Sequence, residues 1–377
     1  MWFLNLIYYV IPFVVLLSIL VFVHEFGHFI VARWTGVKVS AFSIGFGKTL
    51  WSKEDKKGTV WKISAIPLGG YCQFLGDGDA SSSSCAEGLE NLSEEEKKHA
   101  FAFQNPFKKL AIVLAGPGFN YLFAILIYFV MFAAFGKFSM PPVVADVLSG
   151  SAAQIAGIEA GDRITFINSH AIKEWSDISK EILLAANHKA SIDVLRDGKT
   201  LHFDVELLQM DKKQRNQTVQ KQYMLGVKSM GVLEFTHEKF SVFEAFVQSL
   251  KEVWDVTAMT LRGVGQMIVG QRGGEDVGGV IRIAEMTGDI TKNETILDFV
   301  IFLALLSINL GLINLFPIPV LDGGHVVIFI LEILSGRPVK EKTKEYLFKT
   351  GFLILVALMV YATFNDVVHL WNRWFHS

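Results

Sequence analysis

The 377-residue chain is 51% hydrophobic, contains 31 Phe, and only 19% of its residues are charged, which favours a membrane protein over an ordinary soluble domain. The formal net charge of -2, without a basic stripe, argues against a nucleic-acid partner. The two cysteines, Cys72 and Cys85, are too few for a disulfide framework and lack the paired spacing of a structural metal site.

Four apolar segments are long enough to cross a hydrocarbon core of roughly 30 Å as helices, at about 1.5 Å rise per residue. The sequence predicts these spans at residues 6–32, 107–135, 297–320 and 348–370. We expect the first to be a retained span and not a signal peptide, because it lacks a basic start and a small-x-small cleavage site.

Lys and Arg in the short connections predict the orientation, because they mark the cytoplasmic side of a membrane protein. They gather between the first two spans and before the fourth, at Arg33, Lys38, Lys97, Lys98, Lys108, Lys109, Arg337, Lys340, Lys342, Lys344 and Lys349. Both termini are therefore expected outside the cytoplasm. The C-terminal ends of the first and third spans are expected on the cytoplasmic side.

The first span contains the HExxH motif His24-Glu25-Phe26-Gly27-His28. On a helix its two histidines lie one turn apart on one face, so both imidazoles can reach one tetrahedral metal ion, and zinc suits these ligands. Glu25 can take a proton from an attacking water and deliver it to a leaving amine. Ionisable groups inside an apolar span are costly unless paired or metal-bound, which favours a functional site over histidines hydrogen-bonded in a helix bundle.

Residues 37–74 are expected to form a membrane-associated β-hairpin or small sheet of short strands, with glycine turns at residues 45–47 and 69–70. Residues 76–105 are predicted to form a cytoplasmic loop. Its serine run at 81–84 and acidic run at 94–96 are typical of a solvated segment without chemistry.

Residues 142–210 are predicted to form a compact α+β domain outside the cytoplasm, with strands at 143–147 and 191–196 and a turn at Asp197-Gly198. The phrase at residues 149–164 resembles a PDZ domain, whose groove binds an extended peptide as an added strand. This resemblance assigns peptide binding to Ser149, Gly150, Ser151 and Ala152. A packed domain that only shields the membrane site is the alternative.

Residues 211–292 are expected to connect this domain to the second half of the membrane domain, residues 293–377. Within the connection, residues 240–270 repeat apolar positions at helical spacing and predict an interfacial helix. Its apolar face consists of Phe243, Phe246, Val247, Leu250 and Trp254.

The third span ends in an irregular, polar phrase that predicts the remaining metal ligand. A catalytic zinc usually takes three protein ligands and leaves one position for water. Asp322 is the one carboxylate near an apolar end on the same side as the histidines, although a turn or cap role is the alternative. Pro317 and Pro319 break the helix, and irregular backbone at membrane depth is tolerated only where it is buried in protein or lines a water-filled cavity. His325 is not expected to bind, because a fourth ligand would close the water position.

These motifs together resemble the site-2 protease family of intramembrane zinc metalloproteases, in its bacterial regulator of sigma-E protease type. The resemblance rests on HExxH in the first span, Asn-x-x-Pro-x-Pro-x-Leu-Asp-Gly-Gly at residues 314–324, and the PDZ-like insertion. The phrases at residues 45–47, 67–71 and 115–120 agree with it. The chain has room for one PDZ-like domain where well-known relatives carry two, and Val280 stands where proline usually follows the glycines of residues 277–281.

The resemblance implies one zinc ion bound by His24, His28 and Asp322, with Glu25 as general base. It implies that Asn314 holds the substrate backbone or the oxyanion, a role that amide donors suit. Other implied substrate-binding residues are Gly45, Gly47, Gly69, Gly70, Asn120 and Pro317.

The same resemblance implies single-span membrane proteins as substrates, such as anti-sigma factors and remnant signal peptides, and a bacterial inner-membrane location. The strands after the first span would hold an unwound substrate segment as an added strand. Two other classes remain open. A metal transporter or sensor needs polar residues along several spans, and the second and fourth supply few beyond Asn120 and Asn365. An inactive adaptor that presents its PDZ-like domain would not need Glu25 between intact ligands.

Overall fold

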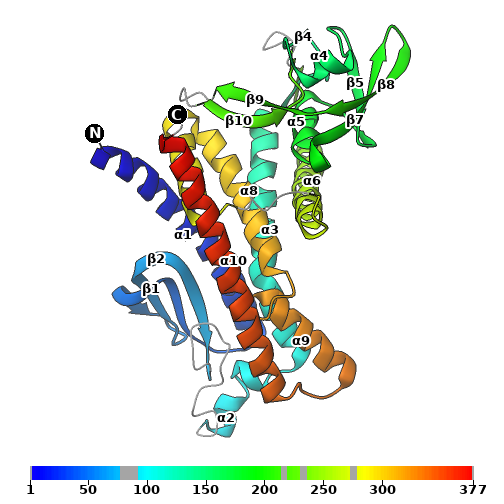
Figure 1. The fold of residues 1–377 in the computed structure, drawn as a ribbon. Helices are drawn as coiled ribbons and strands as arrows, with labels where there is room; N and C mark the ends of the chain where they lie inside the picture. The colour runs from blue at the N-terminus through cyan, green and yellow to red at the C-terminus, as the bar shows by residue number, and fades with distance from the viewer. Residues whose placement is uncertain (1, 77–91, 214–218, 230–235, 272–277, 376–377) are drawn as a thin grey trace. The chain divides into compact units, whose positions relative to one another are not determined.

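The computed structural model describes residues 2–76, 92–213, 219–229, 236–271 and 278–375 (Figure 1). Cys85 and the serine run at 81–84 lie outside the described residues. The chain divides into two compact units, which are treated separately below. Unit 1 comprises Met1–Tyr128 and Val277–His369, and unit 2 comprises Phe129–Asp276 with Leu370–Ser377.

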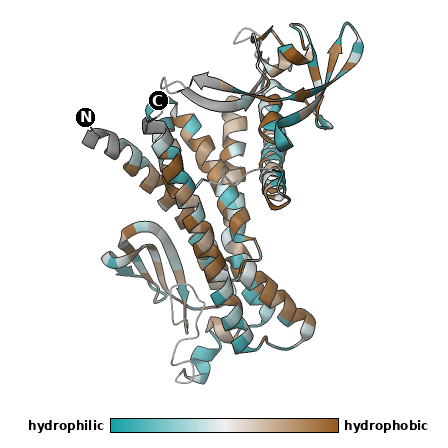
Figure 2. Ribbon diagram, viewed as in Figure 1, coloured by the Kyte–Doolittle hydropathy of each residue, from teal (hydrophilic) through white to brown (hydrophobic). Residues whose placement is uncertain are grey.

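Within the described residues, four helices are long and apolar enough to cross a membrane, and they confirm the four predicted spans. They are α1 (Trp2–Trp34), α3 (Pro106–Phe135), α8 (Ile296–Asn314) and α10 (Glu341–Phe375). Hydrophobic residues predominate along them in Figure 2. The third span ends at Asn314 and not at the expected residue 320, because the chain cannot continue as a helix through Pro317. The chain is therefore a multi-pass membrane protein.

The region after α1 is a folded-over hairpin of two strands, β1 (Val39–Glu54) and β2 (Val60–Phe74). Residues 41–44 of β1 pair with residues 60–63 of β2 on one side and with residues 70–73 on the other, so both strands double back between these segments. Gly45, Gly47 and Gly69, with φ angles of 87°, 81° and 134°, lie where the strands double back, which agrees with the predicted glycine turns. Left-handed φ angles are easily adopted only by glycine, which explains why glycine stands at these bends.

The segment between α8 and α9 (Asp322–Ser335) folds back onto the start of α9. A Cβ atom on Gly323 would lie 2.2 Å from the Phe316 carbonyl oxygen, and one on Gly324 would lie 2.4 Å from Pro319 Cα. Both positions therefore require glycine. The result is that Asp322 occupies the first turn of α9, directly before two residues without side chains.

Helix α7 (Val280–Asn293) begins where the sequence has Val280 in place of proline, and its first turn is capped by the last span. Asp366 of α10 is 2% exposed and accepts hydrogen bonds from the backbone N–H groups of Gly279, Ile281 and Arg282 at 2.8, 3.0 and 3.2 Å. A buried carboxylate in an apolar helix is thus satisfied by the donors at a helix N-terminus.

The apolar core of unit 1 has two parts. One joins α1 to α8 through Leu16, Leu20, Phe302 and Leu303. The other joins α1, the hairpin, α3 and α9, and it consists of Phe29, Ala32, Val37, Val39, Phe42, Cys72, Phe74, Phe101, Ile112, Val113, Ile328 and Phe329. The hairpin is therefore packed into the membrane domain and is not a free loop.

Unit 2 contains an antiparallel sheet with strand order β6-β5-β7-β8, and two helices accompany the sheet. These elements are β5 (Arg163–Ile167), β6 (His170–Ala171), β7 (Lys189–Arg196), β8 (Lys199–Glu206), α4 (Ala152–Ala156) and α5 (Trp175–Leu183). Strand β7 and the tight turn at Asp197-Gly198, with φ angles of 50° and 77°, confirm two predictions. The α+β character of this region is also as expected.

Six short strands complete unit 2 in three pairs. They are β3 (Lys137–Ser139) with β12 (Thr236–Glu238), β4 (Asp146–Val147) with β11 (Val227–Lys228), and β9 (Leu208–Lys213) with β10 (Val219–Met224). The short helical segments are η3 (Ala186–His188) in unit 2 and, in unit 1, α2 (Glu94–Lys97) and η2 (Phe101–Phe103). Helix α6 (Val242–Ile268) forms where an interfacial helix was predicted, and Phe243 and Trp254 are 75% and 70% exposed on it.

A buried ion pair makes unit 2 sensitive to acid. Asp162 is fully buried, and Arg196 donates to its two carboxylate oxygens from Nε and Nη2 at 2.7 Å each. Burial raises the pKa of Asp162, but the bonds from Arg196 and from the Glu159 N–H outweigh it, so the pKa lies below its ordinary 3.8. The pair therefore stabilises the folded state above the ordinary pKa, and this contribution is lost as the pH falls through the lowered value.

We expect Asp162→Asn to weaken unit 2 at neutral pH and to make its stability less dependent on acid. Hydrogen exchange of the β5 and β7 amides in the full chain, at pH 7 and at about pH 3, measures both effects. An equal loss of protection on acidification in the native and variant proteins would contradict this role for the pair.

Candidate metal centre

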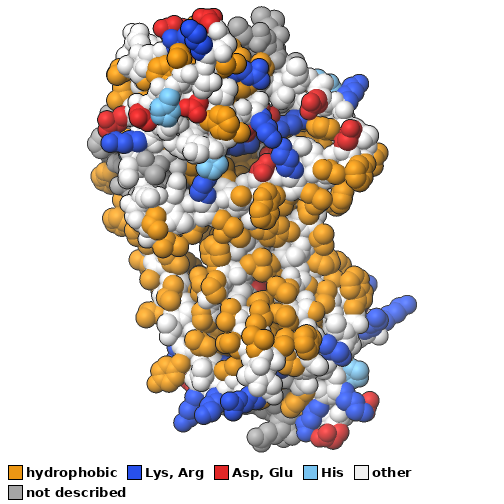
Figure 3. All heavy atoms as spheres, turned by 90° about the vertical axis from the view of Figure 1, so that its right-hand side faces the viewer, with side chains coloured by type: hydrophobic (Ala, Val, Ile, Leu, Met, Phe, Trp, Pro, Cys, Tyr) orange, Lys and Arg blue, Asp and Glu red, His pale blue; other side chains and the backbone are white. Residues whose placement is uncertain are grey.

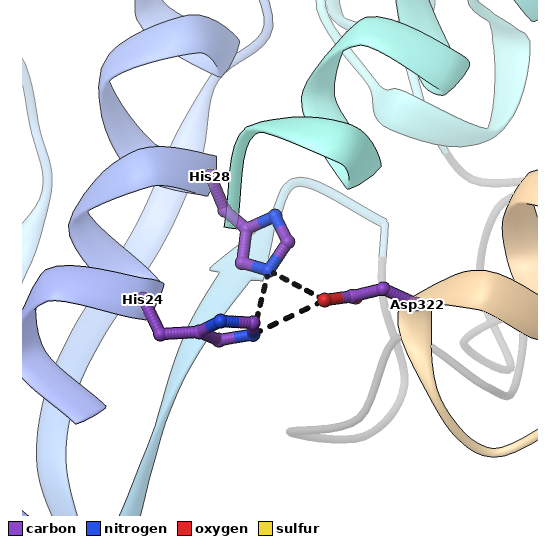
Figure 4. Close-up of side chains that lie close together, drawn as sticks. All are labelled: His24, His28 and Asp322. Atoms are coloured by element: carbon purple, nitrogen blue, oxygen red, sulfur yellow. Dashed lines mark hydrogen bonds and ion pairs between the residues drawn. The ribbon is translucent and has the colours of Figure 1, made fainter. Parts of the chain in front are cut away.

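His24, His28 and Asp322 converge in unit 1, although they come from α1 and α9 (Figure 4). Asp322 Oδ2 lies 3.1 Å from His24 Nε2 and 3.5 Å from His28 Nε2, and the two Nε2 atoms are 3.3 Å apart. Both histidines are buried, and the Asp322 side chain is 17% exposed. The three side chains predicted as metal ligands thus point at one position.

The donor set fits a cation. Asp322 Oδ2 is buried and accepts no hydrogen bond from the described residues. His28 Nδ1 lies 2.8 Å from the Ile112 carbonyl oxygen, which can only accept, so Nδ1 carries the proton and Nε2 presents a lone pair. Ligands at about 2.0–2.1 Å in a tetrahedron are about 3.4 Å apart, and the observed separations of 3.1 to 3.5 Å bracket this value. The residues therefore suit zinc.

Helix α3 lies directly behind the two histidines. A Cβ atom on Gly116 would lie 2.3 Å from His28 Nε2 and 2.9 Å from His24 Cε1, so only glycine leaves room for both imidazoles. On the facing helix, Gly27 is equally close to α3, because its Cβ would lie 2.3 Å from the Ala115 carbonyl oxygen. The two glycines allow the α1 and α3 backbones to approach each other at the site.

Asn120 lies on the same face of α3, one turn beyond Gly116. It is fully buried, and its Nδ2 atom lies 3.1 Å from His24 Nδ1. A role for this residue at the substrate stays a prediction, and its side-chain contact in the structure is with the predicted ligand His24.

Glu25 follows His24 on α1 and lies beside β2. It is half-buried. Its Cγ atom lies 3.6 Å from the point where a Cβ would stand on Gly70 of β2, and the same point is 2.8 Å from Val21 Cγ1. Glycine at position 70 therefore lets β2 lie against α1 beside the Glu25 side chain.

The other predicted site residues are spread over both units. Asn314 is half-buried at the end of α8, and Pro317 is exposed in the segment that precedes α9. His325 contacts the rings of Phe348 and Phe329 at centroid distances of 5.0 and 6.1 Å and does not join the ligand cluster. In unit 2, the predicted peptide-binding residues precede or begin α4, where the buried Ser151 caps the helix by accepting from the Gln154 N–H; these residues are Ser149, Gly150, Ser151 and Ala152.

Sequence reasoning missed Ile112 and Gly116. Ile112 acts through its main-chain oxygen, which no side-chain pattern reveals. The spacing of Gly116 four residues before Asn120, on a predicted span, was the available signal for one helix face.

A cavity of about 470 Å³ in unit 2 is a second candidate site, lined by charged side chains of α5 and α6. Its charges largely pair with one another: Arg262 binds Glu181 at 2.7 Å, and Lys137 binds Glu174 at 3.0 Å. Among the described residues, the group with metal-ligand geometry is the one in unit 1. Metal chemistry is therefore assigned to unit 1.

Comparison with known proteins agrees with this assignment. Residues 12–358 match peptidase family M50. The chain is 37% identical over 368 residues to Atu1380 of Agrobacterium fabrum, named as a candidate zinc metalloprotease, with 96% of each chain covered. It is 32% identical over 372 residues to metalloprotease MmpA of Caulobacter vibrioides, with 93% of each covered. With a zinc-suited ligand set, an HExxH helix and these relatives, the chain belongs to peptidase family M50 and is a zinc metalloprotease.

Proposed function

We propose that this metalloprotease hydrolyses peptide bonds inside the membrane-spanning segments of single-span membrane proteins. The observation that carries the proposal is the depth of the site: His24, Glu25 and His28 lie within the membrane-spanning helix α1. Asp322 follows the short segment that leaves the third span. A soluble substrate would have no ready access to residues on such a helix.

The metal ligands, Glu25 and Asn314 have separate roles in the proposed reaction. A zinc ion held by His24, His28 and Asp322 would polarise the scissile carbonyl and lower the pKa of water. Glu25 accepts the proton of the attacking water and delivers it to the leaving amine. Asn314 donates its side-chain N–H to the developing oxyanion.

The hairpin offers a place for an unwound substrate. Residues 70–74 of β2 pair with β1 on one side, and their other edge begins at Gly70, beside Glu25. A substrate segment that added to this edge as a strand would be extended and would expose its carbonyls next to the general base. Helix opening is required because backbone carbonyls inside a helix are already hydrogen-bonded.

The distribution of Lys and Arg side chains supports the proposed orientation of the chain in the membrane. In Figure 3, Lys and Arg side chains gather at the end of unit 1 that holds α2 and the α9–α10 connection, beyond a face of hydrophobic side chains. Basic connections mark the cytoplasmic side, so both termini lie outside the cytoplasm and the metal centre lies toward it. The named relatives are bacterial, which supports a location in the bacterial inner membrane.

The proposal also covers unit 2, which we infer to be a PDZ-like domain that binds a peptide or protein outside the cytoplasm. Support comes from its α+β architecture and from the phrase that precedes and forms α4. Substrates of the proposed class are anti-sigma factors already trimmed outside the membrane and remnant signal peptides.

The position of the cut tests the function. Single-span substrates, with and without glycine or proline in the span, are reconstituted with the enzyme in liposomes, and the products are identified by mass spectrometry. We expect cuts inside the span, faster in the helix-destabilised substrates, abolished by a chelator and restored by zinc. A zinc-loaded protein that cuts none of these substrates, or cuts them only outside the span, contradicts the proposal. Zinc flux into the same liposomes would then support a transporter.

A further inference from the structure

The Asn120 amide lies beside the metal centre and has one polar atom without a partner. Its side chain is fully buried in a membrane helix, and its Nδ2 atom is 3.1 Å from His24 Nδ1. Its Oδ1 atom has no hydrogen-bond partner among the described residues. Buried amide oxygens are rarely left unpaired, because the lost hydrogen bond to water is not replaced. Which amide atom faces His24 therefore has to be assigned from chemistry, because the two orientations place the oxygen and the nitrogen at nearly the same positions.

Zinc ligation by His24 decides this orientation. His24 faces Asp322 and His28 through Nε2, so Nε2 is the atom that would hold a metal. A neutral imidazole that gives its Nε2 lone pair to a metal carries its proton on Nδ1. That Nδ1–H needs an acceptor, and the group that lies opposite it is the Asn120 amide. Turning the amide by 180° exchanges Oδ1 and Nδ2 at nearly the same positions.

We propose that Asn120 is a positioning residue whose Oδ1 accepts the Nδ1–H of His24 in the zinc-loaded enzyme. This inference rests on the proposed role of His24 as a zinc ligand. In the zinc-loaded state Oδ1 faces the imidazole and fixes the tautomer that offers Nε2 to zinc.

The second histidine ligand, His28, faces a hydrogen-bond acceptor that cannot become a donor. His28 Nδ1 donates to the Ile112 carbonyl oxygen at 2.8 Å, and a main-chain oxygen cannot exchange with a donor. Ile112, Gly116 and Asn120 are spaced by four residues, so one face of α3 supports both imidazoles. The Asn120 main-chain oxygen accepts from Ser307 Oγ at 2.9 Å, which connects this face to α8. Groups that contact a ligand imidazole directly, as the Ile112 carbonyl and the Asn120 amide do, orient metal ligands and raise their basicity.

Three substitutions distinguish a role of the Asn120 side chain as a hydrogen-bond acceptor from a role as a donor and from a role in packing. Asn120→Asp keeps only acceptors, Asn120→Leu keeps the approximate size without polarity, and Ser307→Ala removes the neighbouring bond without touching the amide. Zinc dissociation constants are measured by chelator competition on the purified full chain. We expect Asn120→Leu to weaken zinc binding about 10- to 100-fold, with Asn120→Asp and Ser307→Ala close to native. If Asn120→Asp binds zinc as poorly as Asn120→Leu, or if Asn120→Leu binds like the native protein, the proposal is wrong.

The native protein provides a readout that does not depend on how a variant folds. In ¹⁵N-histidine-labelled protein, the His24 ring shifts report which nitrogen carries the proton. We expect the proton on Nδ1 in the zinc-loaded protein. A proton on Nε2 in the zinc-loaded protein contradicts the proposal.

His24→Ala distinguishes this proposal from the function it rests on. If His24→Ala binds zinc like the native protein, the metal centre itself is wrongly assigned. If His24→Ala loses zinc while folded Asn120→Leu keeps native affinity, the metal centre stands and only the positioning role fails. Circular dichroism of the metal-free variants establishes that each is folded.

Discussion

Replacing Glu25 with glutamine is expected to leave zinc binding unchanged and to lower peptide hydrolysis about 10²- to 10⁴-fold, the range for loss of a general base. Glutamine keeps the size of the side chain but cannot accept the proton of the attacking water. Glu25 does not belong to the ligand cluster of His24, His28 and Asp322, so its charge is not needed to hold the metal. Bound zinc and the single-turnover cleavage rate are measured on the same preparation.

The matched control is His24→Ala, which is expected to lose zinc and activity together. The comparison separates proton transfer from metal binding, because the two residues are adjacent on α1. Retention of about a tenth or more of the native rate by Glu25→Gln would place the general base elsewhere.

Adding one methyl group at Gly116 is expected to disrupt the metal centre more than most substitutions outside the ligands. The new Cβ would lie 2.3 Å from His28 Nε2 and 2.5 Å from His28 Cε1, which forces the ring or α3 to move. Metal ligation requires ligand positions within about 0.5 Å of the productive geometry. We therefore expect Gly116→Ala to weaken zinc binding at least about 100-fold, with proteolysis falling in parallel.

Gly118→Ala is the control on the same helix, because a Cβ at position 118 meets no atom within 4 Å. It makes the same chemical change two residues away and is expected to leave zinc affinity near native. Chelator competition measures both variants. Equal zinc affinity in the two would show that the site tolerates a shifted imidazole and that the close packing of α1 on α3 is not required.

Side-chain chemistry explains which parts of the site were predictable. The His24 and His28 spacing follows from helix geometry alone, and Asp322 could be matched to them from the sidedness of the spans. All three converge as expected. The contribution of α3 could not be predicted in the same way. It depends on a main-chain oxygen at Ile112, on space left empty by Gly116, and on which way the Asn120 amide points.

The glycine bends after α1 were predictable, but the strand pairing around them was not. Gly45, Gly47 and Gly69 were interpreted as turns, because glycine is common there. They lie where β1 and β2 double back, with the left-handed φ angles that turns and bulges share. The pairing of residues 41–44 with both 60–63 and 70–73 depends on long-range contacts and on the packing of Gly70 against α1, which local sequence does not reveal. The four spans were predictable because their apolar length is a strong local signal.

The separation of the metal ligands along the chain has a consequence for biosynthesis. The ribosome makes His24 and His28 at the start and Asp322 near the end, with residues 129–276 of unit 2 in between. A nascent chain that ends before α9 offers two nitrogen ligands and no carboxylate, so it cannot hold the metal as the complete site does. The metal site is therefore complete only after Asp322 has been made and α9 has joined α1.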